Sequence, residues 1–167
     1  SRGALHWRLL QRPSGRNKNG EKSGIAISWY ENGVKASESH YLNGKSDGVY
    51  TFWYANGRKS AEKQTKDGER HGLETYWYQN GRKRSEIFYK NGEQEGLQAY
   101  WYENGQKEHE YCVKDGKKDG RETYWNENGV KASESHYKKG ERDGLRTEWY
   151  EDGSKTREVQ YKDDEEV

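Results

Sequence analysis

One turn-forming segment returns along this chain at a fixed spacing of 24 residues. Its glycine is preceded by Asn in five copies and by Asp in the sixth, and the six glycines are Gly33, Gly57, Gly81, Gly105, Gly129 and Gly153. A tryptophan stands three positions before each Asn or Asp, at Trp29, Trp53, Trp77, Trp101, Trp125 and Trp149. A strict period of this length indicates a repeat array, in which each unit packs on the next one.

Composition limits how thick such an array can be. Hydrophobic residues make up 28% of the chain and charged residues 35%, values that usually indicate disorder or a very thin core. The 7 Trp and 14 Tyr residues are the opposite of a disordered profile. A thin β layer held together by aromatic side chains satisfies both facts.

Each unit contains two strand signals. In residues 73–78 the side chains alternate, and the two faces carry Leu73, Thr75 and Trp77 on one side and Glu74, Tyr76 and Tyr78 on the other. Thr, Tyr and Trp favour strands, and this period of two is typical of a β-strand. The second strand is expected over residues 83–89, with Ser85, Ile87 and Tyr89 on one side.

Asn80-Gly81 joins the two strands, because both residues tolerate the positive φ of a tight hairpin turn. A two-residue turn would place Thr75 opposite Glu86. A three-residue turn with a glycine bulge would shift the pairing by one residue and gather Ile87 onto the Trp77 side. That register also sets like charges against each other, Glu74 against Glu86 and Glu122 against Glu134. We favour the bulged turn.

The sequence therefore predicts an all-β fold, a single elongated and twisted antiparallel β-meander of stacked hairpins with about twelve short strands. Residues 1–24 are interpreted as a degenerate N-terminal cap, with a strand at His6–Gln11, and residues 162–167 as an acidic tail. Six repeats of about 24 residues lie between them: 25–48, 49–72, 73–96, 97–120, 121–144 and 145–161. The tryptophans are expected to stack as a structural ladder on one face.

The order Gly-Lys/Glu-x-Asp-Gly, four residues, and then Trp-Tyr-x-Asn-Gly-x-Lys-x-x-Glu resembles the MORN repeat. The segments 31–35 and 43–48 carry the match, which recurs through residues 25–161 and is most similar to the variant in bacterial YwqK-family antitoxins. Arg121 replaces the usual aliphatic residue, and Asn126 replaces the Tyr. The resemblance implies a non-catalytic, protein-binding scaffold built as a twisted, grooved sheet. Some such modules are proposed to bind phosphoinositides, and the antitoxin likeness implies a neutralised partner.

No residue pattern predicts catalysis, a metal site or a cofactor. His109 and Cys112 are three apart on a strand and so point to opposite faces, and none of the zinc-ligand spacings is present. The glutamates that recur in every unit fit a structural role, whereas glycosyl transfer needs one asymmetric pair. The glycines match neither a dinucleotide fingerprint nor a phosphate loop.

The aromatic face is the predicted binding surface, for a protein or peptide partner. Its residues are Tyr50, Phe52, Tyr54, Tyr76, Tyr78, Tyr100 and Tyr102. Self-association through open sheet ends, or binding of a glycan, the cell envelope or membrane lipid, stays an alternative. Nucleic acid is disfavoured, because each repeat Lys has a Glu three residues on. We expect a soluble chain without a transmembrane segment or signal peptide. Because the sequence has no Met, we interpret it as a piece of a longer product. The sequence does not predict its compartment.

Overall fold

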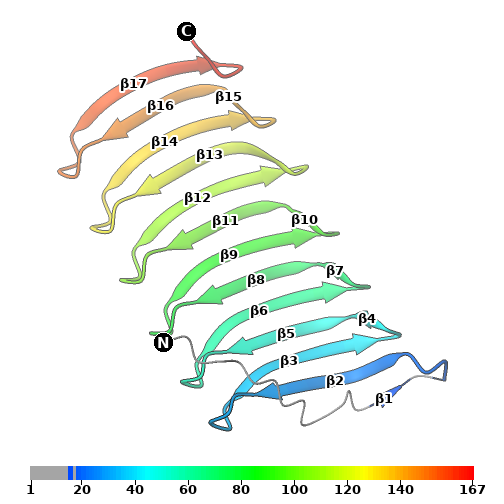
Figure 1. The fold of residues 1–167 in the computed structure, drawn as a ribbon. Helices are drawn as coiled ribbons and strands as arrows, with labels where there is room; N and C mark the ends of the chain where they lie inside the picture. Colours follow the sequence, from blue (N-terminus) through cyan, green and yellow to red (C-terminus); the bar gives the residue numbers. More distant parts are fainter. Residues whose placement is uncertain (1–14, 17) are drawn as a thin grey trace. The chain divides into compact units, whose positions relative to one another are not determined.

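The computed structural model describes residues 15–16 and 18–167, which form strands and turns without a helix. The chain divides into a first compact unit that ends at Gly81 and a second that begins at Arg82. Figure 1 labels most of the strands of both units. The first unit contains β1 (Gly15–Arg16), β2 (Lys22–Trp29), β3 (Lys35–Leu42), β4 (Lys45–Ser46), β5 (Gly48–Trp53), β6 (Lys59–Lys66), β7 (Glu69–Arg70) and β8 (Gly72–Trp77). The second contains β9 (Lys83–Lys90), β10 (Glu93–Gln94), β11 (Gly96–Trp101), β12 (Lys107–Lys114), β13 (Lys117–Trp125), β14 (Lys131–Lys138), β15 (Glu141–Arg142), β16 (Gly144–Trp149), β17 (Lys155–Lys162) and β18 (Glu165–Glu166).

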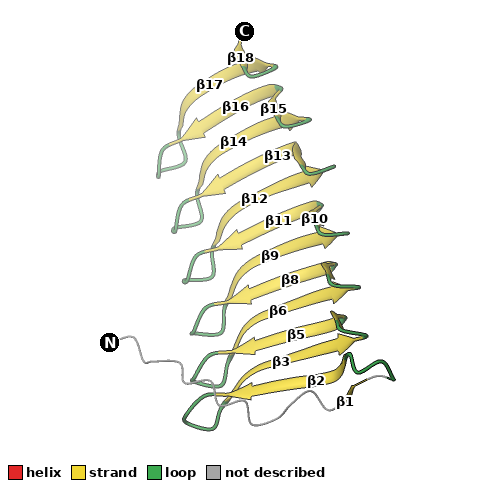
Figure 2. Ribbon diagram, turned by 45° about the vertical axis from the view of Figure 1, so that its right-hand side comes forward, coloured by secondary structure: helices red, strands yellow, loops and turns green. Residues whose placement is uncertain are grey.

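Within each unit the strands pair antiparallel with their neighbours in the chain (Figure 2). Twelve of the described strands are six to nine residues long, two for each repeat, and six are only two residues long. The predicted all-β hairpin repeat and its twelve longer strands are confirmed. The short strands were not predicted; apart from β1, each follows the second turn of a repeat and pairs with the strand before that turn.

The first turn of each repeat is the predicted three-residue turn with a glycine bulge. The Tyr30 amide donates to the Val34 carbonyl at 2.8 Å, and the Gly33 amide donates to the Tyr30 carbonyl at 2.9 Å. Gly33 has φ 81°, and the other five turn glycines also have positive φ, as only glycine adopts readily. The residue before Gly33 does not share this conformation, so the expectation of positive φ at both turn positions was wrong here.

A second irregularity restores the register that the first turn shifts. Trp125 lies opposite Lys131 whereas Tyr124 lies opposite Ser133, so Ala132 is an extra residue in β14. Beyond this bulge Glu122 pairs with Ser135 rather than with Glu134. The predicted pairing of like charges was therefore wrong, because two successive bulges cancel in the body of the hairpin.

The tight turn with two positive φ values is the second turn of the repeat. Asn43 and Gly44 have φ 48° and 80°, the signature of a type I′ hairpin turn. Asp67, Asp115 and Lys139 take the Asn43 position in other repeats, with φ between 50° and 52°. The two turns of a repeat thus have different backbone conformations. The first has a glycine bulge, and the second has two consecutive residues in the left-handed region.

The predicted alternation of side chains along the first strand of the repeat is confirmed. The side chains of the second strand, however, point to the opposite faces from those predicted. Ser85 pairs with Tyr100, so the side of β9 that carries Ser85 shares its face with Tyr100 rather than with a tryptophan. Few side chains are fully buried, and the largest are polar: Gln98, Glu74 and Thr123. Among the described residues each unit is a single sheet without a second layer, so its side chains are buried by their neighbours on the adjacent strands.

Both ends of the described chain continue the hairpin pattern. In the predicted cap, β1 pairs with β2 through Arg16 and Lys22, whereas the predicted strand His6–Gln11 lies outside the described residues. The predicted acidic tail is part of the last repeat, since β18 pairs with β17. Asp163 and Asp164 have φ 49° and 67° and take the place of Asn-Gly in the second turn.

Candidate functional site

The two faces of each sheet differ in the aromatic residues that they carry. We use "tyrosine face" for the side that bears Tyr50 and Tyr76 in the first unit and Tyr100 and Tyr124 in the second. The opposite side, which bears the repeat tryptophans, is the "tryptophan face". Pairing places Phe52 and Tyr76 across Ala61, and Tyr100 and Tyr124 across His109, so the members of each set share a face.

Three of the seven predicted binding residues, Tyr54, Tyr78 and Tyr102, lie just after the strands, where the first turn begins. The Tyr54 hydroxyl donates to the Trp77 carbonyl at 2.6 Å, and the Tyr102 hydroxyl donates to the Trp125 carbonyl at 2.8 Å. Tyr30 makes the same bond to Trp53. These hydroxyls join consecutive repeats, a fold-stabilising contact that the sequence pattern did not predict.

In the first unit, two of the other predicted residues, Phe52 and Tyr76, flank a lysine. The Lys63 ammonium lies 5.9 Å from the centroid of the Phe52 ring and 5.2 Å from that of Tyr76, within cation–π range. Tyr76 also donates through its hydroxyl to Glu74 Oε2 at 3.0 Å. Glu74 is 1% exposed, and its Oε1 lies 3.4 Å from Arg70 Nε, so Tyr76 and Arg70 both contact a buried carboxylate.

Tyr50 belongs to a second contact that the sequence analysis missed. Its ring meets that of Tyr41 edge-on, with centroids 5.9 Å apart, and the Lys22 ammonium lies 3.4 Å from the centre of the Tyr41 ring. The Tyr50 hydroxyl donates to Ser46 Oγ at 2.9 Å. Burial raises the pKa of Tyr50 to about 12, so the hydroxyl stays protonated at neutral pH. Tyr41 could have been found only by knowing the register of β3.

In the second unit, the predicted residue Tyr100 is part of a stack of rings. His109 stacks on Tyr124 with centroids 3.8 Å apart and planes 8° apart, and on Tyr100 at 5.7 Å. Tyr111 stacks on Tyr100 at 6.2 Å. The stack crosses β11, β12 and β13. Three of its four members were missed: Tyr124 continues the 24-residue series of Tyr76 and Tyr100, whereas His109 and Tyr111 recur at no fixed period.

Glu122 lies at the base of this stack and is 4% exposed. Its Oε1 lies 2.9 Å from His109 Nε2, accepts from Lys118 Nζ at 2.5 Å and accepts from the Tyr124 hydroxyl at 3.2 Å. Burial acts to raise the pKa of Glu122, but the hydrogen bonds from His109 and Lys118 outweigh it and lower the pKa to about 2.

The ionised Glu122 in turn affects the tyrosines above it. Burial first, and then the Glu122 charge, raise the pKa of Tyr124 to about 12. The same two causes, with hydrogen bonding to Tyr100, raise the pKa of Tyr111. A carboxylate that is this buried and engaged by three groups holds side chains in place, and we assign it a structural role rather than that of an acid or base.

On the tryptophan face, the predicted ladder alternates tryptophan with lysine. Lys35 Nζ lies 5.1 Å from the centroid of the Trp53 ring in the next repeat, and Lys107 lies 5.4 Å from that of Trp125. The same contact recurs at Trp77, Trp101 and Trp149. Each lysine also pairs with the repeat glutamate, as Lys35 does with Glu38 at 2.8 Å. The six tryptophans are half-buried rather than buried.

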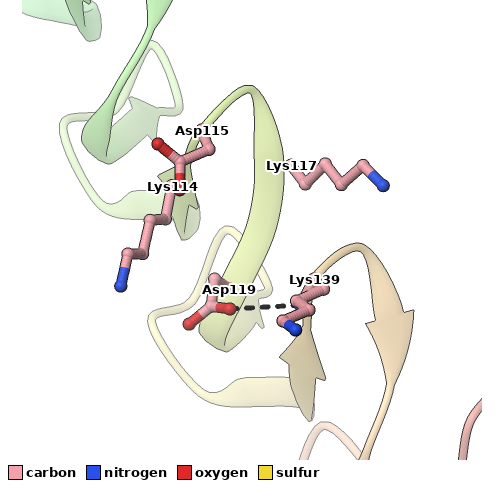
Figure 3. A pocket seen from close by; sticks show the side chains of 5 residues that line it. All are labelled: Lys114, Asp115, Lys117, Asp119 and Lys139. Carbon is pink, nitrogen blue, oxygen red and sulfur yellow. Dashed lines mark hydrogen bonds between the residues drawn. The ribbon is translucent and has the colours of Figure 1, made fainter.

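An open hollow of about 320 Å³ lies at the second turns of the second unit (Figure 3). Its lining residues are Lys114, Asp115, Lys117, Asp119 and Lys139. Asp119 Oδ2 accepts from the Lys139 amide at 3.1 Å, as Asp47 does from the Asp67 amide at 3.2 Å. Asp119 therefore links the second turn of one repeat to that of the next. In Figure 3 the lysine ammonium groups do not converge on one point.

Comparison with protein-family models matches five segments of this chain to the MORN repeat variant: residues 22–43, 70–91, 94–115, 118–139 and 142–163. Together they make up more than half of the sequence. The chain belongs to the MORN repeat variant family. The unmatched segment 46–67 forms the same hairpin, with the same bulge between Phe52 and Trp53. A search of curated proteins found no match to this sequence.

MORN repeats are generally non-catalytic modules that interact with proteins or membranes. Residues 15–16 and 18–167 contain no group of three His, Cys, Asp or Glu side chains that could hold a metal ion. Nor does this part of the MORN chain contain a helix long and apolar enough to cross a membrane.

Proposed function

We propose that this MORN chain is a non-catalytic scaffold that binds a protein partner on the tyrosine face of its repeats. The observation that supports this proposal is the fixed arrangement of aromatic rings and hydroxyl groups there, built on Lys63 in the first unit and on Glu122 in the second. Tyrosine suits protein interfaces because it offers apolar area and a hydrogen-bonding end. Rings that are already ordered lose little entropy on binding.

The resemblance to bacterial YwqK-family antitoxins suggests a more specific form of this proposal. In that form the partner is a toxic protein, and the scaffold neutralises it by covering its active surface. The family match supports the interaction module, whereas the antitoxin role rests on the resemblance alone.

Binding of a glycan, a membrane lipid or nucleic acid agrees less well with the observed surfaces. Sugar rings stack on open aromatic faces, but Lys35 and Lys107 lie over Trp53 and Trp125. Lipid headgroups and nucleic acid favour an unbalanced basic patch. Here Asp115 and Asp119 stand among the lysines of the second turns. A protein partner therefore agrees best with the observed surfaces.

A capture experiment from native extract tests the proposal. The wild type is compared with Tyr76→Ser and Tyr100→Ser, one change on the tyrosine face of each unit, and retained proteins are identified by mass spectrometry. Tyr150→Ser is the matched control, because Tyr150 is 62% exposed and lies at a first turn. We expect a protein that the wild type and the control retain and that the two face variants lose. Equal retention by all four chains, or capture of glycan or lipid alone, contradicts the proposal.

A further inference from the structure

The tryptophan face carries one exposed aliphatic side chain at the same place in nearly every repeat. In the first unit these are Ile25, Val49 and Leu73, which are 40%, 37% and 43% exposed. In the second unit they are Leu97 and Leu145, at 54% and 43%, while Arg121 takes the position between them. Single exposed aliphatic residues are ordinary on a protein surface. Within each unit these residues are in strict register, and we name them the aliphatic row of that unit.

The pairing of the strands fixes the geometry of the aliphatic row. Ile25 lies opposite His40, Val49 opposite Gln64, and Leu97 opposite Cys112. Each aliphatic residue is thus separated from the next by one strand that carries a more polar side chain or a thiol. With strands about 4.8 Å apart, the aliphatic residues within a unit recur about every 9.6 Å.

We propose that the aliphatic row is a contact surface between two copies of this chain, whose tryptophan faces pack against each other. Sheets that pack face to face, about 10 Å apart, are a common way to cover an apolar side of a sheet. Two copies share the 9.6 Å period and stay in register along a unit. An α-helix laid across the strands offers equivalent positions about every 10.5 Å and loses about 0.9 Å of match at each repeat.

The distribution of charge on the tryptophan face agrees with a second copy as the occupant. Charged side chains recur on the second strand of each repeat, as Lys35 and Glu38 do on β3, whereas the first strands carry Trp, a Thr, Ile or Ala, and the aliphatic row, with Arg121 as the exception in β13. Consider a two-fold axis that runs parallel to the strands and lies between two adjacent strands. It places the second strand of each repeat in one copy over the first strand of a repeat in the other copy. Lys35 then faces a tryptophan and Glu38 a threonine or aliphatic residue, so that like charges do not meet. By the same offset each aliphatic residue faces the residue type that pairs with it within one copy, as Ile25 faces His40 and Leu97 faces Cys112.

The size of the surface sets the strength of this pairing. The five longer strands of the first unit span about 24 Å, and six residues of strand span about 20 Å, which gives roughly 480 Å² of face. A stable interface covers about 800 Å² on each partner. A single unit covers less than this, and we therefore expect a weak dimer whose population depends on concentration.

Sedimentation of the full chain over a roughly hundredfold range of concentration tests this proposal. Leu73→Lys and Leu97→Lys are combined to put one charge into the aliphatic row of each unit, at side chains exposed enough to leave the fold intact. Tyr150→Lys is the control, since it adds a lysine at an exposed site outside the row. We expect the wild type and the control to dimerise and the double variant to dimerise at least about tenfold more weakly.

Cys112 provides an independent readout, because it is half-buried in β12 opposite Leu97. Its reaction with a thiol reagent is expected to slow as the wild type dimerises and to be independent of concentration in the double variant. Far-ultraviolet circular dichroism checks that each variant is folded. A wild type that is monomeric throughout the range overturns the proposal, even if another protein is then found on the aliphatic row. A dimer that the double variant keeps, with Cys112 unprotected, also overturns it and places the contact elsewhere.

Discussion

Glu122 offers a quantitative test of the electrostatics of the tyrosine face. Its carboxylate is 4% exposed, yet it is held ionised by His109 and Lys118. The informative change is Glu122→Gln, because Gln98 occupies the same place one repeat earlier and is itself fully buried there. The variant keeps the shape of the side chain and removes its titration.

The magnitude follows from the lowered pKa. The pKa of Glu122 falls from 4.5 to about 2, and each unit of pKa is equivalent to about 1.4 kcal/mol, so ionisation of Glu122 contributes about 3 kcal/mol to the free energy of unfolding. Because the folded pKa is the lower one, this contribution is complete above pH 4.5 and is lost as the pH falls toward 2. By pH 3 about 2 kcal/mol of it is gone.

The assay is urea unfolding of the wild type and Glu122→Gln, followed by circular dichroism at pH 7 and pH 3. Other carboxylates titrate in both proteins, so the difference between the two pH dependences isolates Glu122. We expect the wild type to lose about 2 kcal/mol more than the variant between these pH values. Equal losses, or a side-chain nuclear magnetic resonance titration of Glu122 with its midpoint near the ordinary value, would refute the reasoning.

Three further substitutions test how the repeats are joined. Tyr54→Phe removes the hydroxyl bond to Trp77 and should lower the free energy of unfolding by about 1 kcal/mol, whereas Tyr150→Phe, at an exposed ring, should leave it unchanged. Gly81→Val places a β-branched residue at φ 90° and should cost about 1–3 kcal/mol in urea titrations; a variant as stable as the parent would show that the turn is misassigned. Trp77→Ala should cost about 2–3 kcal/mol, less than a fully buried tryptophan, because its ring is half-buried beneath Lys59; a thermal midpoint that does not move would count against the alternating ladder.

The 24-residue period was enough to predict the architecture. It predicted two longer strands per repeat, a glycine bulge at Gly33 and its equivalents, and the alternation that separates Thr75 from Tyr76. These features depend on local sequence signals, namely the turn residues and the alternation of side chains with a period of two. Both signals recur in every repeat. Repetition therefore compensates for the weak signal of any single strand.

The register could not be predicted in the same way. The extra residue that restores it is Ala36 in the first repeat and Ala132 in the fifth, but it is Ser60 in the second, Glu108 in the fourth and Thr156 in the sixth. No residue type marks this bulge. Since a shift of one residue turns a strand over, the assignment of the second strand to a face could only come from the structure.

The candidate site was predicted in part. Tyr50, Phe52, Tyr76 and Tyr100 lie on the tyrosine face, whereas Tyr54 and Tyr102 join repeats through their hydroxyls. Of the missed residues, His109 and Glu122 occupy positions that change from repeat to repeat, so a search for periodic residues passes over them. Tyr41 does recur, as Tyr89, Tyr137 and Tyr161, but its contact with Tyr50 depends on which strands lie side by side.

The measurement that tests the central claim most directly is the affinity of the captured partner for variants of the two faces. Isothermal titration calorimetry would compare the wild type, the combined Tyr76→Ser and Tyr100→Ser variant, and the combined Leu73→Lys and Leu97→Lys variant. We predict a loss of at least about tenfold for the tyrosine-face variant and a change of less than about twofold for the aliphatic-row variant. The reverse order, with the tyrosine-face variant binding as the wild type does, would contradict the assignment of the tyrosine face as the partner-binding surface.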